Sequence, residues 1–138
     1  MTDEFSDATM QQTAQWVAWF SSAWKPDAPM HIHPDATAAD GEKEWHPDFA
    51  KWLSDDEISK RTSKVMRKLR RRAVREYEVC YRILVLGDRL DATTVWLNER
   101  AERNHIPYPP QRPEGPHYTR KDALALLIAG LTYAKQYW

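Results

Sequence analysis

The sequence has one cysteine, four glycines and no long apolar run. A single cysteine, Cys80, can neither close a disulfide within the chain nor build a cysteine-based zinc site. No stretch approaches the roughly 18 consecutive apolar residues of a membrane-spanning helix. The first residues, MTDEFSD, are acidic where a signal peptide would be basic. We therefore expect a soluble, cytoplasmic chain that does not enter a membrane.

The patterns of common enzyme sites are also missing. The sequence contains no glycine-rich phosphate loop, no Gly-x-Ser-x-Gly and no Cys–His arrangement beyond an apolar Cys80. We expect no catalytic residue, no cofactor and no metal site. A weaker alternative, a metal-dependent enzyme, would centre on His31, His33 and His46, with further oxygen ligands nearby at Asp35, Glu44 and Asp48.

The residues that are present indicate an all-α protein, because glycine and β-branched runs are scarce and Ala, Leu, Glu, Lys and Arg are common. Residues 8–24, ATMQQTAQWVAWFSSAW, predict a first helix capped by Asp7. Two apolar sets recur along it: Met10, Ala14, Val17 and Phe20 or Ser21 on one face, and Trp16, Trp19 and Trp24 on another. The tryptophans either anchor this helix to the body of the protein or form a surface for a partner.

A long helical region is expected after the proline-rich loop 25–47 and a short turn at 48–53. It begins at Ser54, because Ser54 and Glu57 have the spacing of a capping box. Gly87 is placed to end it. Between them, one helix or two nearly continuous helices would bury a stripe that includes the Cys80 thiol: Ile58, Val65, Met66, Leu69, Ala73, Tyr77, Cys80, Tyr81 and Leu84.

Two more helices complete the expected fold. A helix over 89–103 follows an Asp88 cap and buries Leu90, Thr94, Leu97 and Ala101. Residues 105–117 hold five prolines and a glycine and predict an extended connector. A final helix over 120–136, capped near Thr119, is apolar on nearly all sides, which is typical of a core helix or of one shared with a second subunit in a homodimer.

Net charge is zero, but the charges are unevenly distributed. Residues 1–59 hold 12 acids and 3 bases, and residues 60–138 hold 17 bases and 8 acids, so the halves carry about −9 and +9. Residues 60–75 contain no acid. We define as the basic ridge the bases there that recur at helical spacing or lie alongside: Lys60, Lys64, Arg67, Lys68, Arg70, Arg71, Arg72 and Arg75.

Such a row of like charges costs helix stability, and a nucleic-acid backbone would relieve the repulsion. The main alternative to nucleic acid as the partner of the basic ridge is an acidic patch on the N-terminal half of the same chain. Exposed Trp-rich segments of that half could also bind a protein.

The order VREYEVCYRILVLG followed by DRLDATTVWLNERA, residues 74–101, resembles the helix-turn-helix of region 4 of bacterial sigma factors. There, a helix of the type REREVLxLR runs to a glycine and a capped SLxEIAxxL helix follows. WLNERAERNHIPYP and YTRKDALALLIAGL are similar to the LNERGIPTP…WT segment of large serine recombinases. The whole chain resembles small actinobacteriophage helix-turn-helix proteins, most closely over residues 65–138.

The resemblance implies a phage-encoded, DNA-binding regulator of transcription. It makes 89–103 the positioning helix and the helix at Thr119 the reading helix. The connector 105–117 is longer than the turn of a sigma factor, and no recombinase catalytic domain is present. In the expected organisation, residues 1–53 form an acidic, Trp-rich arm, and residues 54–138 form the basic helix and a trihelical unit.

The predicted DNA-binding residues are the basic ridge together with Thr119, Arg120 and Lys121, whose helical turn also presents free amides to phosphate. The alternative function is a protein-interaction module that binds a host or phage protein, such as the transcription machinery, without reading DNA.

Overall fold

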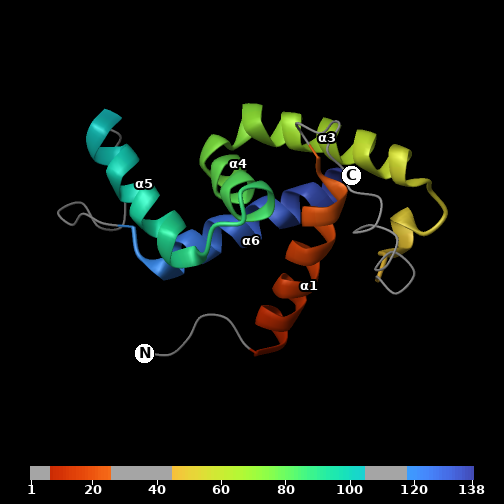
Figure 1. Cartoon of the computed structure of the whole chain (residues 1–138), viewed down its shortest axis with the longest axis horizontal. Helices are drawn as coiled ribbons and strands as arrows, with labels where there is room; N and C mark the ends of the chain where they lie inside the picture. The colour runs from red at the N-terminus through yellow and green to blue at the C-terminus, as the bar shows by residue number, and fades with distance from the viewer. Residues whose placement is uncertain (1–6, 26–44, 105–117) are drawn as a thin grey trace.

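The computed structural model describes residues 7–25, 45–104 and 118–138, and in these ranges it contains helices and no strand. The elements are α1 (Asp7–Ala23), the 3₁₀ turn η1 (Asp48–Ala50), α3 (Asp55–Arg72), α4 (Val74–Cys80), the π turn η2 (Tyr81–Val85), α5 (Leu90–Asn104) and α6 (Arg120–Tyr137). The predicted all-α class is confirmed. α3 spans one edge of the molecule, and α6 runs through its middle (Figure 1).

The long helical region is two helices rather than one. Ala73 has φ −146° and ψ 78°, outside the helical range, and separates α3 from α4. α4 continues into the π turn, and the chain then reverses at Gly87, whose φ of +75° lies in the left-handed region that favours glycine. The predicted stop at Gly87 is thus confirmed.

The core forms around α6. Its buried face packs against α4, α5, α3 and α1. The residues of that face are Ala123, Leu127, Gly130, Leu131 and Ala134. Of the two environments expected for this helix, the core of its own chain is the one observed. What α6 leaves exposed past its first turn is mostly small or polar: Ala125, Ala129, Thr132, Gln136 and the ring of Tyr137.

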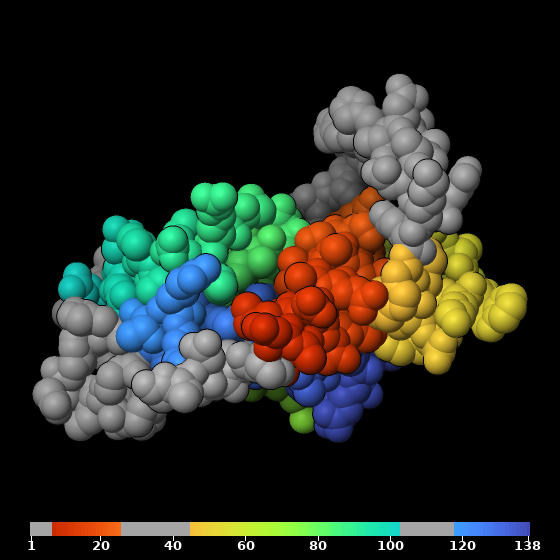
Figure 2. All heavy atoms as spheres, turned by 90° about the horizontal axis from the view of Figure 1, so that it is seen from below, coloured from red at the N-terminus to blue at the C-terminus, as the bar shows by residue number. Residues whose placement is uncertain are grey.

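α1 packs on this core through its aromatic residues. Trp19, Phe20 and Trp24 are buried, which confirms the prediction that tryptophans anchor this helix. Of the other predicted set, Phe20 is buried and Val17 is half-buried against the core, whereas Met10 and Ala14, nearer the start of the helix, are exposed. Large rings bury far more apolar area than Met or Ala, so the helix turns its aromatic side inward. α1 and the segment around η1 lie side by side in Figure 2.

α5 buries Thr93, Leu97 and Ala101, while Leu90 and Thr94 are half-buried. The helix begins at Leu90, later than an Asp88 cap predicts. The Asp88 carboxylate instead accepts a hydrogen bond from Arg82 Nε at 2.8 Å, across the Gly87 turn. The pair holds η2 and the start of α5 together.

Cys80 is a buried thiol, as predicted, with no exposed surface. Burial raises its pKa to about 12, with a smaller contribution from Glu76. Because the thiolate is the reactive form, native Cys80 should react with iodoacetamide at pH 8 at least about ten times more slowly than the urea-unfolded chain. Mass spectrometry of timed samples measures both rates. Fast labelling of the native protein would show that the contact between α4 and α6 opens readily.

Within the described ranges, no helix is both long enough and apolar enough to cross a lipid bilayer.

Candidate nucleic-acid interface

α3 begins with the predicted capping box. Ser54 Oγ accepts a hydrogen bond from the Glu57 amide at 3.2 Å, and the Glu57 carboxylate accepts from the Ser54 amide at 3.2 Å. Asp55 and Asp56 add negative charge to the first turn, and arginines occupy the last turn. Acids at the start and arginines at the end of a helix interact favourably with the helix dipole. The distribution of charge along α3 therefore stabilises this helix.

The inner face of α3 is fixed by packing and by one polar contact. Ile58, Val65, Met66 and Leu69 are buried. Thr62 lies among them without exposed surface, and its hydroxyl donates to the Ile58 carbonyl at 2.7 Å. The same hydroxyl accepts from Trp138 Nε1 at 2.9 Å. This hydrogen bond from Trp138, together with the buried apolar residues, determines which face of α3 points to the core.

With that face buried, the basic ridge points to solvent. Its α3 members are all exposed: Lys60, Lys64, Arg67, Lys68, Arg70, Arg71 and Arg72. Lys60 pairs with Asp56 at 3.1 Å, and the Arg70 guanidinium lies 5.8 Å from the centre of the Tyr77 ring. In the described part of the chain, no acid lies within ion-pair distance of the remaining five: Lys64, Arg67, Lys68, Arg71 and Arg72.

Arg75 differs from the rest of the ridge, because it follows the break at Ala73 and is half-buried on α4. Its guanidinium lies 5.8 Å from the centre of the Tyr118 ring. Tyr118 immediately precedes the Thr119 turn, so Arg75 connects the end of the ridge with the second predicted contact region.

The Thr119 turn also forms the predicted cap. Thr119 Oγ1 accepts from the Asp122 amide at 3.2 Å, and the Asp122 carboxylate accepts from the Thr119 amide at 2.8 Å. Thr119, Arg120 and Lys121 are exposed. Arg120 Nε lies 3.2 Å from Asp91 Oδ1, and both side chains are mostly exposed. Since the Thr119 hydroxyl caps its own helix, Arg120 and Lys121 are the basic side chains that this turn presents at the surface.

Asn98 positions this turn and was not predicted to do so. Its side-chain amide donates to the Tyr118 carbonyl at 3.0 Å, and its oxygen accepts from the Tyr118 amide at 2.7 Å. The pairing joins α5 to the residue before α6 across 20 positions of sequence. No local pattern signals such a contact.

Glu78 links α4 to α5. Its Oε2 lies 3.1 Å from Arg100 NH2, and its Oε1 is buried without a hydrogen-bond partner in the described structure. Burial raises the pKa of Glu78 above its ordinary value of 4.5, although Arg100, Arg70 and Arg75 each act to lower it. The Glu78 carboxylate thus attracts two arginines of the basic ridge, Arg70 and Arg75.

Beyond its first turn, α6 offers few polar side chains to a groove. From Ala123 onward one side of the helix is core, and the exposed side carries Ala125 and Ala129 before it reaches the polar Thr132 and Gln136. Alanine can contact the thymine methyl group in the major groove but forms no hydrogen bond with a base edge. The interface therefore combines an extended basic surface with two basic residues at a helix start.

For the metal alternative, His46 and Asp48 lie in the described structure, while His31, His33, Asp35 and Glu44 lie outside the described residues. His46 Nδ1 accepts a hydrogen bond from Trp19 Nε1 at 3.2 Å. Among the residues with described positions, no three potential ligands converge.

Comparison with protein-family models, curated proteins and solved structures finds no match to this chain. The resemblance to sigma region 4, serine recombinases and phage regulators remains a prediction from the residues.

Proposed function

We propose that the chain binds duplex DNA, with the basic ridge on the phosphate backbone and the Thr119 turn as a second contact. The observation that carries the proposal is the exposed row of five ridge bases without an acid partner in the described structure. In a helix-turn-helix arrangement, α5 would be the positioning helix and α6 the reading helix. The function class is a DNA-binding regulator of transcription.

Electrostatics support a backbone ligand. Bases three and four positions apart on a helix repel each other, and the described structure compensates little of that charge. A phosphate backbone has matching opposite charge, and its binding releases condensed counterions. Backbone contacts fix orientation without reading sequence, so most of the affinity would be independent of sequence.

Base reading would fall to Arg120 and Lys121. Arg120 must exchange its contact with Asp91 for the ligand, and exposed ion pairs of this kind contribute little to stability. Arginine in the first turn of a helix can contact guanine O6 and N7 in the major groove. With only two such side chains, the preference among sequences would be modest.

The decisive experiment replaces Arg67, Lys68 and Arg71 with glutamine and measures binding to a blunt, fluorescently labelled duplex over a salt series. The slope of log K against log salt is negative, with about −0.9 for each phosphate contact. Loss of three contacts should therefore make the slope less negative by about 2.7. Affinity at about 50 mM salt should fall at least tenfold. Circular dichroism establishes that the variant keeps its helices.

Lys64→Gln and Lys51→Gln form a control pair, since each removes one charge from an exposed lysine, Lys64 on the ridge and Lys51 outside it in an ion pair with Asp48. Only Lys64→Gln should weaken binding to the blunt duplex. If the wild type fails to bind duplex at about 50 mM salt, the DNA proposal is wrong. The ridge would then suit an acidic protein surface, as in an interaction module of the transcription machinery.

A further inference from the structure

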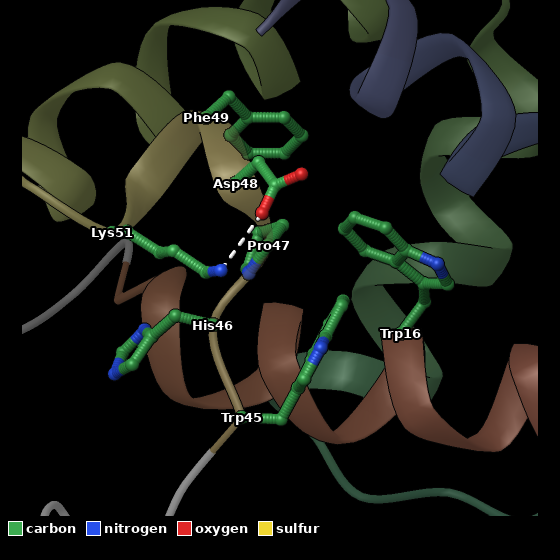
Figure 3. A pocket seen from close by; sticks show the side chains of 7 residues that line it. All are labelled: Trp16, Trp45, His46, Pro47, Asp48, Phe49 and Lys51. Carbon is green, nitrogen blue, oxygen red and sulfur yellow. Dashed lines mark ion pairs between the residues drawn. The ribbon is translucent and has the colours of Figure 1, made fainter.

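A hollow of about 640 Å³ lies beside η1, apart from the outer face of α3. Trp16 comes from α1, and the other lining residues come from the segment 45–51 (Figure 3). Trp16 meets Trp45 edge to face at 5.0 Å between ring centres and stacks on Phe49 at 5.9 Å. We call this site the aromatic hollow; it is lined by Trp16, Trp45, His46, Pro47, Asp48, Phe49 and Lys51.

The aromatic hollow is continuous with the ridge helix. Phe49 packs on Trp138 with ring centres 4.6 Å apart, and the Arg61 guanidinium of α3 lies 5.6 Å from the centre of the Trp138 ring. Arg61 is exposed and was not among the predicted site residues. On the other side, Lys135 Nζ lies 4.9 Å from the Trp16 ring centre. Cations therefore flank the aromatic rings from both α3 and α6.

The rings of this site are partly open to solvent. Trp45 is 40% exposed and Phe49 39%. The acid in the lining, Asp48, pairs with Lys51 at 2.9 Å, so the carboxylate charge is offset within the hollow itself. Aromatic faces beside cationic side chains, next to a surface that suits phosphates, are the combination by which proteins hold single-stranded nucleic acid.

We propose that the aromatic hollow stacks an unpaired nucleobase of a nucleic-acid strand whose phosphates lie along α3. The inference rests on the proposed function and narrows its ligand to nucleic acid with a single-stranded tail or gap. Stacking tolerates every base because each base has a π face. The Asp48 oxygens can accept from an exocyclic amino group, which would favour cytosine, adenine or guanine over thymine.

The test compares a blunt duplex with the same duplex carrying a single-stranded deoxycytidine tail, using fluorescence anisotropy at fixed salt. The tail should raise wild-type affinity about tenfold, and Trp45→Ala should remove that gain while leaving blunt-duplex binding unchanged. Trp45→Phe, which keeps a stacking ring, should retain most of the gain. This rescue separates lost stacking from lost folding.

Trp52→Ala is the matched control, because Trp52 is 92% exposed in the same segment but does not line the hollow. It should leave the gain intact. Ridge-dependent duplex binding without any gain from the tail would overturn this inference alone, whereas absence of binding to the blunt duplex would overturn the proposed function. A proline-rich peptide that binds the wild type but not Trp45→Ala, when the tail gives no gain, would show that the occupant is a peptide, and would also overturn the inference.

Discussion

Replacing Phe20 with alanine should lower the free energy of unfolding by about 3–5 kcal/mol, the usual loss for a fully buried aromatic ring. Phe20 has no exposed surface and contacts Trp16 and Trp19 at ring-centre distances of 5.6 and 5.0 Å. α1 itself packs against η2, α3 and α6. Urea unfolding followed by circular dichroism gives the change from the shift in midpoint at constant slope.

Met10→Ala is the matched control on the same helix. Met10 is 39% exposed, so its truncation should change the free energy of unfolding by no more than about 0.5 kcal/mol. Comparable losses in both variants would mean that the Met10 side of α1 contributes as much to packing as its aromatic face, because alanine favours helix formation at both positions. A loss below about 1 kcal/mol for Phe20→Ala would make α1 an accessory arm on a core that is complete without it.

Local signals in the sequence predicted the starts of α3 and α6 and the stop at Gly87. Ser54 with Glu57 and Thr119 with Asp122 are capping pairs three residues apart, and each forms both of its hydrogen bonds. Gly87 ends a helical region because a left-handed residue is needed there. Each of these features depends on interactions among a few consecutive residues, so the local sequence is enough to predict it.

Contacts between distant segments could not be predicted in this way. How much of each apolar set of α1 is buried depends on which other segments of the chain pack against it. The hydrogen bond from Trp138 to Thr62 joins residues 76 positions apart and decides how α3 is turned. Periodicity gives a helix its faces but does not identify the partner of each face.

The candidate site also has one part that the local sequence predicts and one part that depends on contacts between distant segments. The basic ridge follows from helical spacing, and its α3 members are exposed as that spacing predicts. The aromatic hollow draws on α1 and η1, and its flanking cations come from α3 and α6. Four separate segments have no shared pattern in the sequence, so only the folded chain reveals the hollow.

Gly130→Ala should destabilise the fold by about 1–3 kcal/mol, although alanine is intrinsically the better helix former by about 1 kcal/mol. A Cβ at this position would lie 2.5 Å from Cys80 Sγ and 3.2 Å from the Glu76 carbonyl oxygen. Cys80 is fully buried, so its sulfur has little room to move. The crowding at the contact between α4 and α6 therefore outweighs the helix preference. Ala129→Gly, one position earlier and exposed, gives the helix-propensity cost alone.

A double-mutant cycle with Cys80→Ala isolates the steric contribution. Cys80→Ala alone leaves a small cavity, and in its background the methyl group of Gly130→Ala can occupy the space that the sulfur vacates. The second substitution should then be neutral or stabilising, with a coupling free energy of at least about 1 kcal/mol. Additive losses in the cycle would mean that the clash is with the Glu76 backbone. In that case the spacing of α4 and α6, rather than the thiol, requires glycine at this position.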